Sequence, residues 1–173
     1  MKKQQKEESW TMNYKEALDN DIIVSGDLVA FPGTTWKERL LEGVTTGYHS
    51  VGIVYIPDKD NRYLYQFKPF KSVVISNLDD VTFPFTVVKT GMPWNKKVYA
   101  ETRMPIGERY GYFNAIFATF SKNDPFGNFF TSTYAASILN AGGYRLSLLG
   151  CTPTELVQDL LNLGRKMVEI TNE

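Results

Sequence analysis

Residues 130–143 read FTSTYAASILNAGG and form the stretch of the sequence that is most informative about the fold. The hydroxyl residues near its start and the glycine pair at its end are typical of the two boundaries of a helix. Small side chains at Ala135, Ala136 and Ser137 would let such a helix lie close to a neighbouring element. We therefore expect a tightly packed helix here, with Thr131 as its N-cap residue.

The segments around this helix alternate between strand-like and helix-like patterns. Runs rich in Val, Ile and aromatic residues predict strands at 28–31, 50–56, 62–67, 72–75 and 83–89. Because the strands between residues 50 and 89 follow one another without intervening helices, a meander with antiparallel pairing is favoured. Apolar spacing and capping residues predict helices at 14–18, 36–41, 94–103, 112–120 and from Thr152 onward. The pattern indicates an α+β fold.

The chain is predicted to form one domain. Its 173 residues are enough for a core of ordinary size, and they contain no repeat, low-complexity block or linker. We assign residues 1–20 to an N-terminal tail and short helix, and residues 21–173 to the single domain.

Charge and composition exclude several classes of function. The 19 basic and 19 acidic residues balance, so no broad attraction for nucleic acid is expected. No apolar run approaches the roughly 20 residues that span a bilayer. The first 20 residues lack the apolar stretch of a secretory signal. We expect a soluble protein of the cytoplasm or of a virion.

The single cysteine and the single histidine limit the chemistry further. Cys151 alone forms no internal disulfide, and together with His49 it is too little for a zinc centre. We expect neither a metal nor a cofactor. Cys151 stands just before the capping residues of the last helix, where a thiol pKa can be lowered. We nevertheless interpret it as a small side chain of the core.

Four short segments follow one another in a suggestive order. They are SGDLVAF at 25–31, TGYHSVGIVY at 46–55, YLYQF at 63–67 and IGERYGY at 106–112, ahead of the helix at 130–143. In this order they resemble the NlpC-type, circularly permuted branch of the papain-like amidase superfamily. The resemblance covers most of the chain and implies a papain-like fold, in which an antiparallel sheet or partly closed barrel packs against a few helices.

The resemblance also implies a catalytic arrangement. In that superfamily a cysteine at a helix N-terminus is the nucleophile, a histidine on a neighbouring strand is the base, and a third polar group orients the histidine. In this sequence Thr131 stands where the cysteine belongs, Ser50 where the histidine belongs, and Gln66 in the third place. A threonine hydroxyl stays protonated at neutral pH and is a poor nucleophile without strong activation.

His49 is one residue away from the expected position of the histidine. Because side chains of a strand alternate between its two faces, His49 is expected to point away from the face that Ser50 occupies. A bulge at Tyr48 and His49 would bring the two side chains to the same face.

Two functions remain open on this reading. The first is a catalytically degenerate papain-like domain that binds a partner or builds an assembly, such as part of a phage particle. Its partners would be another protein or further copies of the chain, with a cell-wall peptide or a lipid as ligand. The second is an active amidase or acyltransferase that uses Thr131 or Ser132 with His49 and Gln66.

Overall fold

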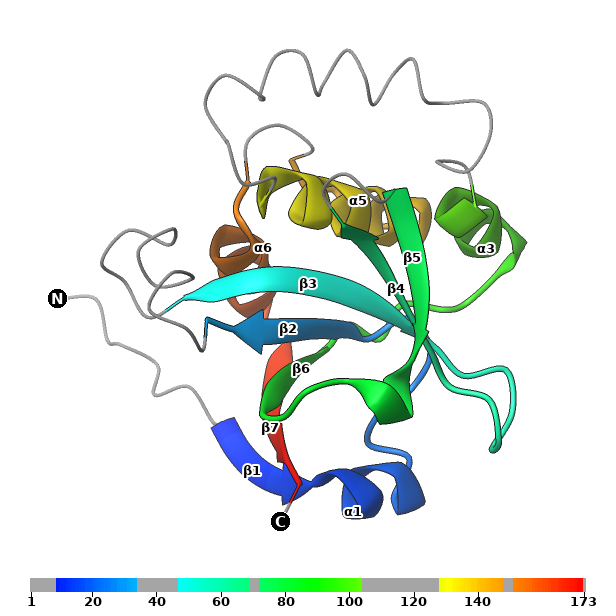
Figure 1. The fold of residues 1–173 in the computed structure, drawn as a ribbon. Helices are drawn as coiled ribbons and strands as arrows, with labels where there is room; N and C mark the ends of the chain where they lie inside the picture. The colour runs from blue at the N-terminus through cyan, green and yellow to red at the C-terminus, as the bar shows by residue number, and fades with distance from the viewer. Residues whose placement is uncertain (1–8, 34–46, 69–71, 104–127, 148–150, 173) are drawn as a thin grey trace, which may run out of the picture.

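The computed structural model describes residues 9–33, 47–68, 72–103, 128–147 and 151–172. Seven strands of these residues form one open sheet in the order β1-β7-β6-β2-β3-β4-β5 (Figure 1). The strands are β1 (Ser9–Asn13), β2 (Leu28–Pro32), β3 (Tyr48–Tyr55), β4 (Tyr63–Lys68), β5 (Ser72–Asn77), β6 (Phe85–Lys89) and β7 (Lys166–Thr171).

All neighbouring strands pair antiparallel except β1 and β7, which are parallel. The five predicted strands are confirmed, and β3, β4 and β5 pair in sequence as the predicted meander requires. The extension of that meander to residues 83–89 is wrong, because β6 pairs with β2 and β7 and not with β5. Strands β1 and β7 are not predicted by the sequence analysis. The described sheet ends at β1 and β5, so it is an open sheet and not a barrel.

Four α-helices accompany the sheet within the described residues. They are α1 (Tyr14–Asp19), α3 (Lys96–Arg103), α5 (Asn128–Ala141) and α6 (Pro153–Asn162), with a short 3-10 helix η1 (Leu78–Asp80) after β5. The helices predicted at 14–18, 94–103 and from Thr152 are confirmed. The helices predicted at 36–41 and 112–120, and the segment at 106–112, lie outside the described residues.

The start of α6 follows the sequence signal closely. The Thr152 side chain accepts a hydrogen bond from the Glu155 backbone N–H, while the Glu155 carboxylate accepts one from the Thr152 N–H. Pro153 follows at the first helical position, where its missing N–H costs nothing. These local interactions stabilise the helix start without help from distant residues.

Helix α5 begins earlier than the sequence predicts. It starts at Asn128, so Thr131 lies at the end of its first turn and the prediction of Thr131 as N-cap is wrong. Residues 131–136, together with Ile138 and Leu139, are all buried. A helix buried around most of its circumference belongs to the core, and its small residues allow the close packing.

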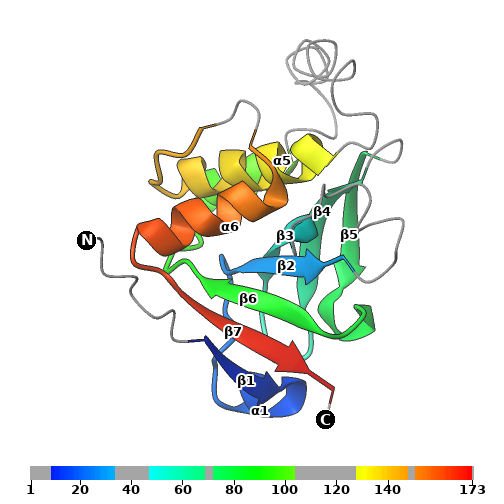
Figure 2. The same ribbon diagram turned by 90° about the vertical axis from the view of Figure 1, so that its left-hand side faces the viewer.

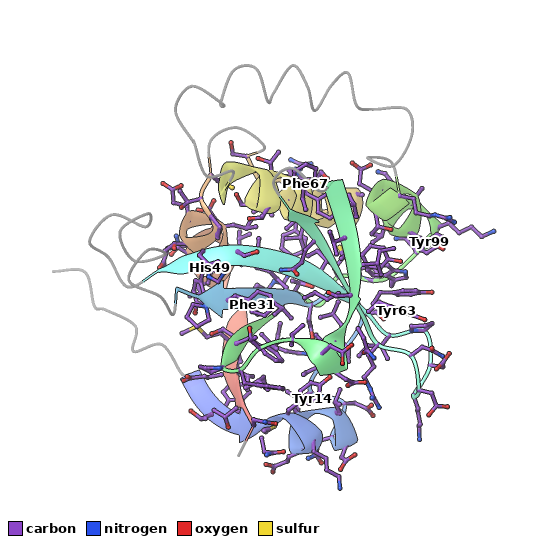
Figure 3. All side chains as sticks on the ribbon, viewed as in Figure 1. Tyr14, Phe31, His49, Tyr63, Phe67 and Tyr99 are labelled. Carbon is purple, nitrogen blue, oxygen red and sulfur yellow. The ribbon has the colours of Figure 1, made fainter. Side chains whose placement is uncertain are left out.

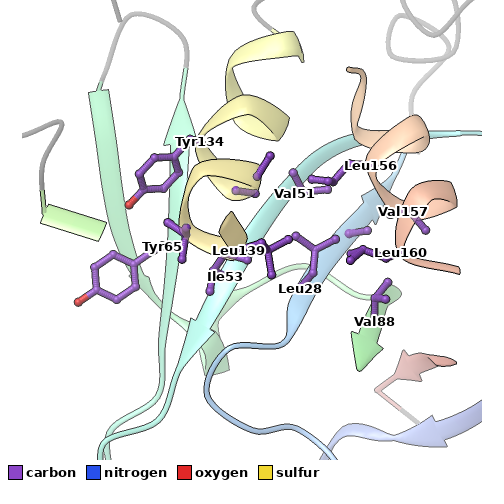
Figure 4. Close-up of a cluster of buried hydrophobic side chains, with 14 of the residues drawn as sticks. Leu28, Val51, Ile53, Tyr65, Val88, Tyr134, Leu139, Leu156, Val157 and Leu160 are labelled. Carbon is purple, nitrogen blue, oxygen red and sulfur yellow. The ribbon is translucent and has the colours of Figure 1, made fainter. Parts of the chain in front are cut away.

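The sheet has a separate hydrophobic core on each side. On the first side, which we call the helix face, α5 and α6 lie side by side over the sheet (Figure 2). Figure 4 shows this core, in which side chains of the helices meet Leu28, Val51, Ile53, Tyr65 and Val88. The second side, which we call the opposite face, carries the alternate residues of the same strands, among them Val29, Phe31, Val54, Leu64 and Val87.

Within the described part of the chain, no helix combines the length and the apolar character that crossing a bilayer requires.

Candidate functional site

A pocket of about 270 Å³ opens on the opposite face of the sheet, where β2, β3 and β4 meet the segment after β5. His49, Ser50 and Gln66, three of the residues singled out by the sequence, line it together. Figure 3 shows His49 and Phe31 on the neighbouring strands β3 and β2. The other described residues of the lining are Phe31, Ser76, Asp80, Val81 and Thr82.

A bulge in β3 brings His49 into this pocket. Phe31 pairs with Ser50, but the next residue, Pro32, pairs with Tyr48, so His49 is an extra residue on its strand. Pro32 has no N–H to donate to the ladder, which is a physical reason for the irregularity at this point. The expectation that His49 points away from Ser50 is therefore wrong, and the bulge that would bring them together is present.

The His49 ring is oriented by a backbone carbonyl. Its Nδ1 atom lies 3.2 Å from the carbonyl oxygen of Pro32, and His49 is half-buried. A carbonyl oxygen only accepts hydrogen bonds, so Nδ1 carries the proton that is shared with Pro32. In the neutral ring, Nε2 is then left as a hydrogen-bond acceptor.

Ser50 and Gln66 are joined across β3 and β4. The Gln66 side-chain amide donates from Nε2 to the Ser50 hydroxyl oxygen over 3.3 Å, and Gln66 is only 5% exposed. Gly52 makes room for this arrangement, because a Cβ atom at that position would lie 2.6 Å from Cγ of Gln66. The glycine thus lets the Gln66 chain lie across β3 toward the pocket.

Thr131 and Ser132 lie on the helix face instead. Both belong to α5, which packs against the side of β3 and β4 that carries Val51 and Tyr65. Thr131 is 4% exposed, and the fully buried Ser132 hydroxyl donates a hydrogen bond to the carbonyl oxygen of Cys151. Neither residue is among the described residues that line the pocket. The sheet therefore brings His49, Ser50 and Gln66 together and places Thr131 and Ser132 on its other side.

Cys151 is a buried member of the helix-face core, as the sequence predicts. Burial raises the pKa of the Cys151 thiol, an effect that the Ser132 hydroxyl partly offsets. Because the thiolate is the nucleophilic form, a raised pKa lowers the reactivity of this cysteine at neutral pH.

The sequence analysis missed the far wall of the pocket. Ser76 lies on β5 opposite Leu64 of β4, while Asp80 ends η1 and Thr82 follows it. One signal was available for Ser76: in an antiparallel meander, alternate residues of 72–77 share a face with alternate residues of β4. Nothing local marks Asp80 or Thr82, because they reach the pocket only through the path that the chain takes after η1.

The described residues contain no group of three or more His, Cys, Asp and Glu side chains that could hold a metal ion. A second pocket, of about 330 Å³, is lined by Leu18, Ile23, Asp58 and Arg62 among others and contains none of the predicted site residues.

Comparisons with known proteins add no support to the resemblance, which rests on the sequence motifs alone. No protein-family model matches this chain, and no curated protein matches it.

Proposed function

We propose that this chain is a non-catalytic relative of the papain-like amidases and that it functions as a binding module. One observation carries the proposal. The candidate nucleophiles Thr131 and Ser132 lie on α5 over the helix face, whereas the candidate base His49 lines a pocket on the opposite face.

Acyl transfer of this type requires the nucleophile and its base within hydrogen-bond reach, at about 2.6–3.2 Å. The Ser132 hydroxyl donates a hydrogen bond to the Cys151 carbonyl, and the described hydrogen bond of the His49 ring joins it to Pro32. Neither contact activates a hydroxyl, since a carbonyl oxygen accepts a hydrogen bond but is too weak a base to remove the proton. This separation supports a binding function over the alternative hydrolase.

The pocket suits recognition of a polar ligand. Six of its eight described lining residues carry hydrogen-bonding side chains, and two, Phe31 and Val81, are apolar. Ligand sites commonly combine a few placed polar groups with an apolar wall. Of the two ligand classes that the resemblance implies, a cell-wall peptide fits such a lining better than the acyl chain of a lipid, because an acyl chain would leave the polar groups unpaired.

The proposal is tested by incubating the protein with peptidoglycan fragments and with chromogenic acyl esters. We expect no turnover above the buffer rate for the wild-type protein, because the candidate nucleophiles Thr131 and Ser132 lie on the other side of the sheet from His49. The His49→Ala, Thr131→Val and Ser132→Ala variants should behave in the same way, as measured by product release.

Ser137→Ala is the matched control, because it removes another hydroxyl from α5 whose hydrogen bond goes only to the Tyr134 carbonyl. Turnover that disappears in His49→Ala and in Thr131→Val or Ser132→Ala, but persists in Ser137→Ala, would show an active hydrolase and refute the proposal.

A further inference from the structure

We infer that the pocket around His49 binds a primary ammonium group. The inference rests on the proposed binding function and names the chemical class of its ligand. Some polar atoms of the pocket are hydrogen-bonded within the protein, and the inference follows from those that remain available to a ligand.

His49 offers an acceptor. Its Nδ1–H is directed at the Pro32 carbonyl, 3.2 Å away, so the neutral ring presents Nε2 as the atom that remains for a ligand. A ligand atom that meets Nε2 must therefore carry a proton to donate.

Gln66 offers a second acceptor. Its Nε2 donates to the Ser50 hydroxyl, and the described residues provide no hydrogen-bond partner for its carbonyl oxygen Oε1. The space left by Gly52 positions the Gln66 chain across β3, so that the amide lines the pocket. Its Oε1 can accept a hydrogen bond from a ligand.

Asp80 supplies negative charge at the exposed edge of the same pocket. Among the described lining residues it is the only Asp or Glu, and there is no Lys or Arg to neutralise it. Two acceptors and one carboxylate match a group with several N–H donors and a positive charge. A carboxylate or phosphate ligand would be repelled by the Asp80 charge and would meet no Lys or Arg among the described lining residues.

The hydroxyls of Ser76 and Thr82 can also accept from such a ligand, and Phe31 and Val81 offer an apolar surface to the carbon chain that carries it. The pocket has about 270 Å³ of space. A cavity of about 150 Å³ holds a benzene molecule, so an amino acid side chain or the end of a peptide is of suitable size.

The inference is tested by titrating the protein with small amines while the His49 ring is followed by NMR. His49 is the only histidine in the chain, so its ring signals need no further assignment. We expect saturable shifts with Nα-acetyl-lysinamide or with glycinamide, with dissociation constants in the millimolar range for ligands this small. The first probe presents a side-chain ammonium and the second an α-ammonium, so the two distinguish the sources of the group.

Asp80→Asn should weaken binding of the better probe about 5-fold, the effect of losing one exposed ion pair worth about 1 kcal/mol. Asp79→Asn is the matched control, because Asp79 contacts Tyr14 and Arg62 and is not among the described lining residues. It should change the dissociation constant less than about 2-fold.

Three results would overturn the inference: equal shifts with diacetylated lysinamide, which has no ammonium group; no saturable shift at tens of millimolar of either amine; or equal weakening by Asp80→Asn and Asp79→Asn. None of these three results would be evidence for enzymatic activity. Conversely, hydrolytic turnover would refute the proposed function without changing the amine titration, so the two failures can be told apart.

Discussion

Replacing Asp27 by alanine is expected to lower the free energy of unfolding by about 4 kcal/mol, since the change leaves several partners of a buried charge unpaired. The Asp27 carboxylate is fully buried directly before β2. It accepts the backbone N–H groups of Val24 at 3.0 Å and Thr90 at 3.2 Å, and it pairs with the Lys89 ammonium. One side chain thus ties the turn before β2 to the end of β6.

The contrast with Asp27→Asn sharpens this prediction. Burial raises the pKa of the Asp27 carboxyl, although Lys89 and the two N–H donors oppose that shift. Because burying the carboxylate charge is itself costly, the neutral amide should be tolerated better. We expect Asp27→Asn to lower the free energy of unfolding by about 2 kcal/mol. Urea denaturation of both variants measures the difference. The exposed Asp60→Ala serves as control, and a loss below about 1 kcal/mol in Asp27→Ala would contradict the role assigned to this carboxylate.

Tyr134→Ala is expected to destabilise the protein by a similar amount, about 4 kcal/mol, because it opens a large cavity between α5 and the sheet. Tyr134 is fully buried on the helix face, and its ring lies 6.4 Å from that of Phe67 between centroids. Its hydroxyl donates to the Thr102 carbonyl at 2.8 Å and so joins α5 to α3.

Tyr134→Phe separates the hydrogen bond from the packing. It keeps the ring and should cost only about 1 kcal/mol, the usual net value of one hydrogen bond. Thermal unfolding of the two variants gives both values. Tyr99→Ala, at a ring that is 37% exposed, is the control and should lose less than about 1 kcal/mol. Equal losses in Tyr134→Ala and Tyr99→Ala would show that α5 is not held in the core as described.

The parts of the fold that local sequence controls were predictable. The start of α6 depends on Thr152, Pro153 and Glu155, which are neighbours in the chain. The pairing of β3 with β4 and of β4 with β5 depends on short apolar runs separated by turns. The parallel pair of β1 and β7 was missed, because it joins the two ends of the described chain and the local sequence of a strand does not indicate which distant strand it pairs with. A weak signal existed in β7, where the buried Val168 and Ile170 flank the exposed Glu169.

The candidate site was predictable only in part. The sequence singled out His49, Ser50 and Gln66, and the meander brings them to one pocket. The face on which His49 lies depends on the bulge opposite Pro32, which strict alternation along β3 does not show. The start of α5 was placed too late, because the hydroxyl at Thr131 resembles a cap although the helix already begins at Asn128.

The position of the His49 ring tests the central claim most directly, and nuclear Overhauser effects to its ring protons measure it. From the structure we expect a ring protonated at Nδ1, with Overhauser effects to residues on the pocket side of the sheet, where Phe31 and Val81 also line the pocket. The single histidine makes these contacts unambiguous. Contacts from the ring to the Thr131 methyl group on α5 would place base and candidate nucleophile together and contradict the account.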